Sequence, residues 1–296
     1  LQDILFGTPD PCLGEINLGV LKADHVNVIV HGHEPILSEV VATAAQDPEM
    51  LELARQAGAA GIVIAGMCCT ANELLMRHGI PVAGNMKMQE LAIATGAVDA
   101  MVVDLQCIMQ GDVALAQRFH TKCITTSPKA MIRGAEHIEF DEHHALEDAE
   151  KIVRLAIDNF QNRRSEVMIP KQKSPIVAGF GVESVEYHLG GTFRGSYYTL
   201  NDNIINGRIR GIGGVVGCNN ARTRHNEGHI QVVKELIKND VIVLTTGCNA
   251  IACAMEGLLT PESAKVYCGP GLAEICETVG IPPVLHLGSC VDNSRI

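Results

Sequence analysis

The chain has 296 residues, of which 47% are hydrophobic and 3% aromatic, and its formal net charge of −11 comes from 34 acidic and 23 basic side chains. Nucleic acid and anionic membrane surfaces repel an acidic protein, so the charge argues against both as partners. No apolar run reaches the roughly 18 residues that a membrane-spanning helix needs, and the N-terminal segment lacks the pattern of a signal peptide. We therefore expect a cytoplasmic protein without a membrane span.

Short β-branched runs alternate with helical patterns along the first half of the chain. Such runs are typical of buried parallel strands. The predicted strands are, in chain order, 25–30, 61–66, 80–84, 100–104 and 122–126. Helices are predicted between them, followed by a long amphipathic one: 36–57, 70–78, 86–95, 110–119 and 142–164.

The pattern restarts after a polar segment with two prolines, 165–175, which predicts a linker. Strands are predicted beyond it at 175–180, 209–217, 240–247 and 282–288, and helices near 226–238, 249–257 and 261–277. The alternation predicts an α/β protein of two doubly wound, parallel-sheet (Rossmann-like) domains. The first, 1–168, would carry the motifs HGH, MCC and LQC, and the second, 169–296, the motifs GCNN, GCNA and GSC.

The chain contains eleven cysteines and no CxxC pair. A large chain with an odd cysteine count does not suit a disulfide framework, and a closed structural zinc site usually needs a CxxC pair. Reduced thiols remain, as buried apolar side chains or as ligands of an iron–sulfur site. Five cysteines are interpreted as buried structural residues: Cys12, Cys123, Cys253, Cys268 and Cys276.

Six predicted strands end beside a possible metal ligand. The carboxyl ends of parallel strands form the ligand-binding crevice of an α/β sheet, and glycines there let the backbone approach a bulky inorganic group. A simple cubane needs four ligands, so six positions predict a cluster with an additional metal. Two of these positions hold two candidate residues each, two histidines at one and two cysteines at the other, and the sequence pattern does not show which of the two is the ligand. The candidates are His31 or His33, Cys68 or Cys69, Cys107, Cys218, Cys248 and Cys290.

The segments HGHEPILSE, GMCCTANE, VDLQCI, GVVGCNN, TTGCNA and LGSCVDNSR, in this order, resemble the nickel–iron carbon monoxide dehydrogenases of anaerobes. The resemblance covers nearly the whole chain. It implies the reversible oxidation of CO with water to CO₂, two electrons and two protons. The implied cofactor is a nickel–iron–sulfur cluster of the Ni-4Fe-4S or Ni-4Fe-5S type.

The resemblance also implies a ligand set of one imidazole and five thiolates: His33, Cys69, Cys107, Cys218, Cys248 and Cys290. His33 and Cys69 would bind the iron that lies outside the cubane. Cys107, Cys218 and Cys248 would bind the three irons of the cubane. Cys290 would bind nickel, and Cys268 is the alternative nickel ligand. His31 would be a second catalytic histidine that donates a hydrogen bond or moves protons. The implied partners are CO, CO₂ and water, an electron acceptor such as a ferredoxin, and a second copy in a homodimer.

Family members carry further 4Fe-4S clusters on an upstream helical domain and a catalytic lysine downstream. We therefore expect this chain to be the central part of a longer enzyme and to oxidise little CO alone. Two other functions stay open. One is a reductase of hydroxylamine or nitric oxide, like the hybrid cluster proteins. The other is a nucleotide-binding α/β module, suggested by the glycine-rich segments 179–184 and 211–217.

Overall fold

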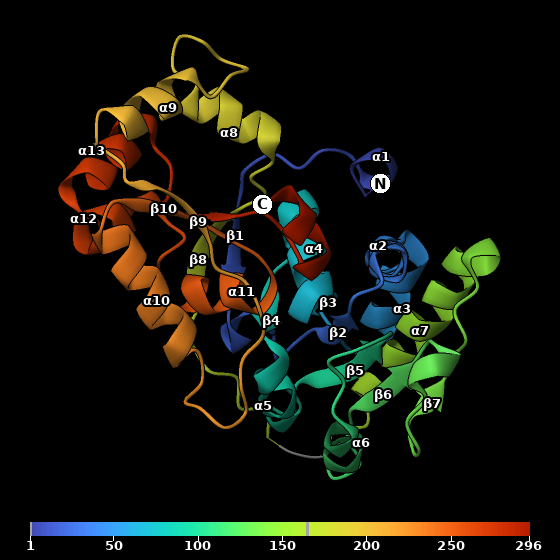
Figure 1. Cartoon of the computed structure of the whole chain (residues 1–296). Helices are drawn as coiled ribbons and strands as arrows, with labels where there is room; N and C mark the ends of the chain where they lie inside the picture. Colours follow the sequence, from blue (N-terminus) through green and yellow to red (C-terminus); the bar gives the residue numbers. More distant parts are fainter. Residues whose placement is uncertain (1, 164–165) are drawn as a thin grey trace. The chain divides into compact units, whose positions relative to one another are not determined.

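The computed structural model of the chain describes residues 2–163 and 166–296 (Figure 1). It confirms the predicted α/β class, with mostly parallel strands and many helices. The chain forms two compact units. Unit 1 comprises Leu1–Ile16, Leu75–Gly79 and Ser174–Ile296, and unit 2 comprises Asn17–Leu74 and Ile80–Lys173. No helix in the described part of the chain is long and apolar enough to cross a membrane.

The units do not coincide with the predicted domains 1–168 and 169–296. The difference arises because the first strand of the chain, β1 (Cys12–Ile16), pairs residue by residue with β8 (Ser174–Ala178) in unit 1. Residue 165 of the predicted linker lies outside the described residues. Residues 166–173 form no helix or strand, as expected of a linker, and β8 begins directly after them.

The strands of unit 2 are β2 (Val26–Gly32), β3 (Ile62–Met67), β4 (Val82–Gly84), β5 (Val98–Val103), β6 (Lys122–Thr125) and β7 (Glu136–His137). Its helices are α2 (Pro35–Ala44), α3 (Pro48–Gln56), α4 (Cys68–His78, whose last residues belong to unit 1), α5 (Gln89–Ala94), α6 (Gln110–Ala116) and α7 (Ala145–Phe160). Its 3₁₀ helices are η1 (Leu18–Val20), η2 (Met86–Met88), η3 (Pro128–Ala130) and η4 (Glu142–His144).

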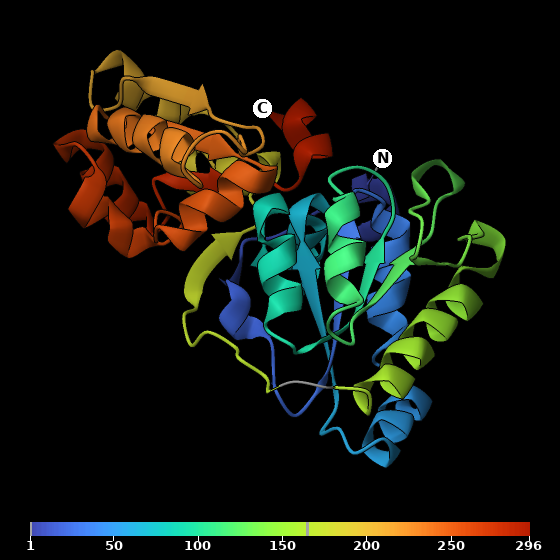
Figure 2. The same ribbon diagram turned by 90° about the horizontal axis from the view of Figure 1, so that it is seen from below.

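The sheet of unit 2 has the strand order β7-β6-β5-β2-β3-β4, and its strands are parallel. With β2 counted as the first strand, this is the order of the dinucleotide-binding Rossmann sheet, and β2 and β5 flank its switch point. Right-handed crossovers then place the connections on opposite faces on either side of that point. Accordingly, α2, α3 and α7 pack together on one face, and α5 and α6 on the other (Figures 1 and 2).

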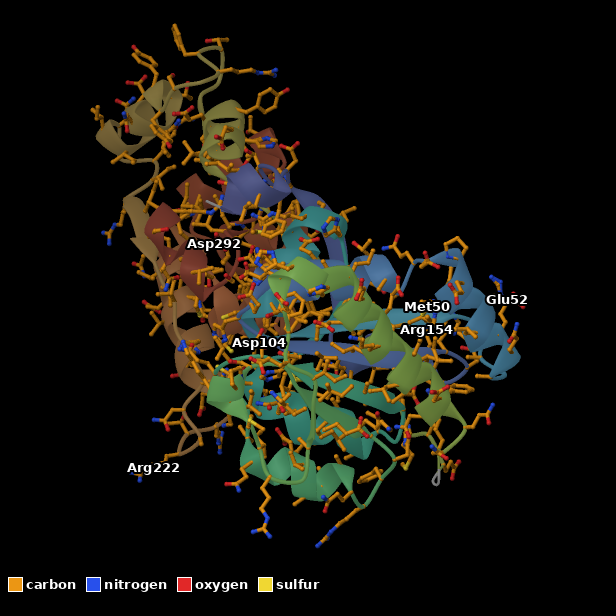
Figure 3. All side chains as sticks on the ribbon, turned by 90° about the vertical axis from the view of Figure 1, so that its right-hand side faces the viewer. Met50, Glu52, Asp104, Arg154, Arg222 and Asp292 are labelled. Carbon is orange, nitrogen blue, oxygen red and sulfur yellow. The ribbon has the colours of Figure 1, made fainter. Side chains whose placement is uncertain are left out.

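The prediction of one helix over 36–57 is wrong, because the segment forms α2 and α3. Asp47 is the N-cap residue of α3, and its Oδ1 accepts a hydrogen bond from the Glu49 N–H at 2.7 Å. Pro48 occupies the first helical position of α3. Proline has no N–H to continue the preceding helix. Met50 of α3 is buried in the unit, while Arg154 of α7 reaches Glu49 at the surface (Figure 3).

The strands of unit 1 are β1, β8, β9 (Gly211–Gly214), β10 (Val241–Thr245) and β11 (Val284–His286). Its helices are α1 (Gln2–Phe6), α8 (Val182–Leu189), α9 (Tyr198–Ile205), α10 (Glu227–Lys238), α11 (Gly247–Met255), α12 (Ala264–Tyr267) and α13 (Pro270–Val279), with 3₁₀ helices η5 (Pro261–Ser263) and η6 (Cys290–Arg295). The predicted helix over 261–277 is thus divided, because Gly269 and Pro270 separate α12 from α13.

The sheet of unit 1 has the order β1-β8-β11-β10-β9. β8, β11, β10 and β9 are mutually parallel, whereas β1 is antiparallel to β8. Helices cover both faces. On one face, Val185 of α8 and Leu200 of α9 line a cavity of about 410 Å³ together with Leu244 of β10. On the other, Leu236 of α10 lies beside Val241 of β10. The carboxyl ends of β9, β10 and β11 therefore meet at one edge of this sheet.

Candidate metal centre

The two histidines that flank Gly32 have different partners in unit 2. His31 lies within β2, is 1% exposed, and its Nε2 is 3.5 Å from the Sγ of Cys68. His33 follows the strand, and one of its ring nitrogens lies within 4.8 Å of the Cys69 Sγ. The backbone of Cys68 is left-handed, with φ of 63°, which turns the two neighbouring thiols in different directions. His33 therefore lies close to Cys69, whereas His31 lies close to Cys68.

Three of the predicted ligand thiols lie in the first turn of a helix: Cys69 in α4, Cys248 in α11 and Cys290 in η6. The unsatisfied N–H groups and the dipole at such a position favour a negative charge. A thiol must lose its proton before it binds a metal, so this position favours the thiolate that a ligand requires.

A buried carboxylate, that of Asp104, lies at the switch point of unit 2 (Figure 3). Asp104 directly follows β5, and its oxygens accept hydrogen bonds from the backbone N–H groups of His33, Glu34 and Leu105. Burial raises the pKa of Asp104, and these N–H groups oppose the rise. The backbone at Gly32 has φ of 133°, and a methyl group there would overlap this carboxylate. Only glycine leaves room for Asp104.

The loop that follows β5 also orients the His33 ring. Its Nδ1 lies 3.4 Å from the Leu105 carbonyl oxygen. A carbonyl only accepts hydrogen bonds, so Nδ1 carries the proton and Nε2 keeps its lone pair for a metal.

Cys107 lies on a loop with an unusual backbone. Gln106 and Cys107 both have left-handed conformations, with φ of 54° and 57°, which non-glycine residues rarely adopt. The buried Gln89 side chain donates from Nε2 to the Cys107 carbonyl oxygen at 2.6 Å. Such local strain persists only where the surroundings hold it, and it clusters at functional sites. Gln89 and Asp104 are the contacts that hold this loop.

The three candidate thiols of unit 1 follow adjacent parallel strands: Cys218 after β9, Cys248 after β10 and Cys290 after β11. Hydrogen bonds connect their loops. The Asn249 Nδ2 donates to the Val215 carbonyl at 2.7 Å, and the Gly247 N–H donates to the Gly288 carbonyl at 3.0 Å. The sheet edge therefore carries three thiol-bearing loops that are joined to one another.

Cys290 is preceded by an arrangement like that beside His33. Gly288 has φ of 123°, and a methyl group on it would overlap the buried carboxylate of Asp292. That carboxylate accepts from the Ser289 N–H at 2.7 Å and from the Arg295 Nε at 2.9 Å. In each unit, a glycine and a buried aspartate thus fix the backbone beside a proposed ligand; Figure 3 labels the two aspartates, Asp104 and Asp292.

No cysteine in the described part of the chain forms a disulfide, as the sequence predicts. Burial raises the pKa of Cys123, Cys268 and Cys276 to about 12, and it also raises the pKa of Cys12 and Cys253. A raised pKa suits a buried thiol that packs as a small apolar side chain, which is the role predicted for these five cysteines.

The donors fit iron and nickel. Unit 2 offers one oriented imidazole and two thiols, and unit 1 offers three thiols at one sheet edge. Thiolates are the usual ligands of iron–sulfur clusters and also suit nickel, and one imidazole marks a metal ion that differs from its neighbours.

The glycine-rich segment 211–217 does not form a phosphate-binding loop, because Gly211–Gly214 forms β9 and the next helix, α10, begins only at Glu227. The other segment, 179–184, leads from β8 into α8, with Gly181 as the N-cap residue. In unit 2, the N–H groups at the start of α2, where a Rossmann sheet binds pyrophosphate, already donate to Asp104. The segment 211–217 and the start of α2 therefore disfavour the nucleotide-binding module.

A family comparison decides the relationship. The model of the Prismane/CO dehydrogenase family matches residues 1–296. The chain belongs to this family. Carbon monoxide dehydrogenase 1 of Methanosarcina mazei is 58% identical over 297 residues, which are 100% of this chain and 46% of that relative. Carbon monoxide dehydrogenase 1 of Carboxydothermus hydrogenoformans is 47% identical over 306 residues, which cover 100% of this chain and 48% of that relative.

Solved structures of the family agree. An as-isolated, nickel-free carbon monoxide dehydrogenase of Thermococcus sp. AM4 matches with a TM-score of 0.95 and 54% identity, over 99% of this chain and 46% of that one. The chain thus spans about half the length of the family members that it matches.

The sequence predicts a set of donor residues for this CO dehydrogenase family chain, but it does not predict the buried groups that the structure places beside their loops. Asp104, Gln89 and Asp292 are buried polar side chains around the ligand loops. One signal was present for Asp104, because it is the first polar residue after the apolar run of β5. No pattern in the sequence singles out Gln89, which reaches the Cys107 loop from α5.

Proposed function

We propose that this chain carries the ligands of a nickel–iron–sulfur cluster at which carbon monoxide is oxidised with water to CO₂, two electrons and two protons. The donor set carries the proposal: an imidazole whose Nδ1 faces the Leu105 carbonyl oxygen and a neighbouring thiol in unit 2, and three connected thiol loops at one sheet edge in unit 1. Family membership supports the same reaction, since the relatives named above are carbon monoxide dehydrogenases.

The proposed ligands are those that the resemblance implies: His33, Cys69, Cys107, Cys218, Cys248 and Cys290. When bound, the cluster supplies the Lewis acidity and the redox capacity of the reaction. His33 binds through Nε2, because the Leu105 carbonyl holds the proton on Nδ1. Cys69, Cys248 and Cys290 lie in the first turns of α4, α11 and η6, and backbone N–H groups at the start of a helix suit a negatively charged ligand atom.

His31 is proposed to hold a proton for the reaction. Its Nε2 lies 3.5 Å from the Cys68 Sγ, so one proton can be shared between these two atoms. The imidazole is 1% exposed, which shields that proton from bulk water. Histidine is the side chain that most often acts as a general acid or base, so His31 is suited to receive protons that the reaction releases.

Metal analysis tests the proposal. The protein is purified anaerobically at its natural length, and nickel, iron and sulfide are measured together with CO-dependent reduction of a viologen dye. Cys290→Ala should remove nickel and retain much of the iron, whereas Cys218→Ala should lower iron. Equal loss of both metals in both variants would contradict the assignment. A wild-type protein that binds iron and sulfide but no nickel would instead favour a hybrid-cluster type of reductase.

A ferredoxin-like electron acceptor, a homodimer and a cytoplasmic location remain predictions from the family resemblance. The prediction that the chain alone oxidises little CO is tested in the same dye assay, by comparing residues 1–296 with the protein at its natural length.

A further inference from the structure

We infer that Asp104 is a positioning residue for the metal centre, which fixes the ring of His33 and joins the loops that carry His33 and Cys107. The inference rests on the proposed function, because it takes these two residues to be metal ligands. Asp104 itself is not proposed to contact the metal.

The side chain of Asp104 is hydrogen-bonded to the backbone of both loops. Its two oxygens accept from the His33 N–H at 2.8 and 2.9 Å, and Oδ2 also accepts from the Glu34 N–H at 2.7 Å. Oδ1 accepts from the Leu105 N–H as well. His33 and Glu34 follow β2, whereas Leu105 follows β5 and precedes Cys107. One carboxylate thus connects the backbone segments on both sides of the switch point.

Burial makes this connection specific. Asp104 is 3% exposed, and a carboxylate at such a depth is costly unless N–H groups satisfy it. The space for it exists only because residue 32 is glycine, whose backbone takes a left-handed φ of 133°. Carboxylate, glycine and N–H groups therefore form one interdependent arrangement.

The arrangement reaches the His33 ring through Leu105. Asp104 fixes the peptide N–H of Leu105, and the carbonyl oxygen of the same residue accepts from the His33 Nδ1 at 3.4 Å. That contact sets the tautomer, so Asp104 indirectly directs Nε2 towards the metal. Groups that orient a ligand in this way typically change metal affinity or activity about 10- to 100-fold when they are altered.

A comparison with nucleotide-binding sheets explains why an aspartate lies here. In a sheet of this strand order, the N–H groups at the start of the helix after the first strand bind a pyrophosphate. In unit 2 that helix is α2, and the donors are the N–H groups of His33 and Glu34. The protein's own carboxylate takes the place of the ligand anion, and the residue that it fixes is the proposed metal donor.

The test is Asp104→Asn in the anaerobic protein at its natural length. Asparagine keeps the shape but replaces one acceptor oxygen by an NH₂ group, which would face a backbone N–H. We expect iron to be lost to a chelator about 10-fold faster than from wild type, with an altered Mössbauer signal for the histidine-bound iron. The matched control is Asp112→Asn, a buried carboxylate of unit 2 whose oxygens have no hydrogen-bond partner in the described chain. It should leave iron release and spectrum unchanged.

The outcomes separate this inference from the proposed function. Wild-type protein without a nickel–iron–sulfur cluster would contradict the proposed function. A wild-type cluster together with unchanged iron release and spectrum in Asp104→Asn would overturn only the inference. Circular dichroism checks the fold, and Asp104→Ser, which is smaller and keeps an oxygen acceptor, replaces the first variant if that one does not fold. If neither folds, Asp104 supports the whole unit and the inference is wrong.

Discussion

Arg163 and Asp99 form a buried ion pair at the amino end of the unit 2 sheet, and its removal should be costly. The Arg163 Nε and one NH₂ group donate to the two Asp99 oxygens at 3.0 and 2.7 Å. The same side chain donates to the carbonyls of His25 and Ala97, which lie beside β2 and β5. His120 also contacts Asp99, at 2.9 Å. The Asp99 side chain is 0% exposed and that of Arg163 is 11% exposed.

Arg163→Met should lower the free energy of unfolding of unit 2 by about 3–5 kcal/mol, because it leaves a buried carboxylate without its cation. This is a large share of the roughly 5–15 kcal/mol that stabilises a typical domain. Adding Asp99→Asn should restore part of the loss, since the stranded charge is then absent. The matched control is Arg154→Met, which removes an exposed pair with Glu49 at 2.8 Å and should cost about 0–1 kcal/mol.

The chain offers a way to follow each unit separately. It has no Trp, and its four Tyr residues all lie in unit 1: Tyr187, Tyr197, Tyr198 and Tyr267. Urea unfolding is therefore followed by tyrosine fluorescence, which reports unit 1, and by far-ultraviolet circular dichroism, which reports both units. The reasoning is refuted if Arg163→Met costs less than about 1 kcal/mol, or if the tyrosine transition carries the loss.

Three further predictions concern glycine and buried titratable groups. Gly32→Ala should lower the free energy of unfolding by at least about 2 kcal/mol more than Gly58→Ala does. Both glycines have positive φ, but only Gly32 adjoins a carboxylate, that of Asp104. Equal urea midpoints of the two variants would contradict this prediction. Burial raises the pKa of Asp112 to about 6, so the stability linked to its protonated form is lost as pH rises through that value. Asp112→Asn should therefore raise the free energy of unfolding by up to about 3 kcal/mol above pH 7 and leave it unchanged below about pH 4. Burial lowers the pKa of His286 to about 4, so the stability linked to its neutral form is complete above about pH 6.5 and is lost as pH falls through 4. From pH 7 to pH 5, the tyrosine-detected urea midpoint should fall further in wild type than in His286→Gln, in which only other groups such as His188, whose pKa is also lowered by burial, still contribute.

The predicted strands of both units were found near their predicted positions because buried parallel strands leave short apolar runs that end at glycine or polar residues. β1 was missed for a physical reason. Its sequence, CLGEI, lacks a continuous apolar run, and its partner β8 begins at Ser174, so only a long-range pairing makes it a strand. Helices α8 and α9 were missed as well, since they flank the glycine-rich turn at 190–195.

At the candidate metal centre, the sequence predicts a donor set, but the residue pattern alone does not choose between neighbouring histidines or neighbouring cysteines. The choice between Cys68 and Cys69 depends on the left-handed backbone at Cys68, which is set by packing and not by residue type. The choice between His31 and His33 depends on where β2 ends, at the residue between them. Apart from the position of Asp104 after the apolar run of β5, the sequence does not reveal the supporting carboxylates, because most of their partners are backbone N–H groups, which nearly every residue has.

The pairing of β1 with β8 imposes an order on the synthesis of the protein. β1 ends at Ile16 and β8 begins at Ser174, so a ribosome must add 174 − 16 = 158 residues before the partner strand starts to exist. At about 5–20 residues per second, this takes roughly 8–30 s. Residues 17–74 and 80–173 have been synthesised before that time, so unit 2 can fold while β1 still lacks its partner strand. An unpaired strand can associate with other chains, so the nascent protein should be most prone to aggregation in this interval.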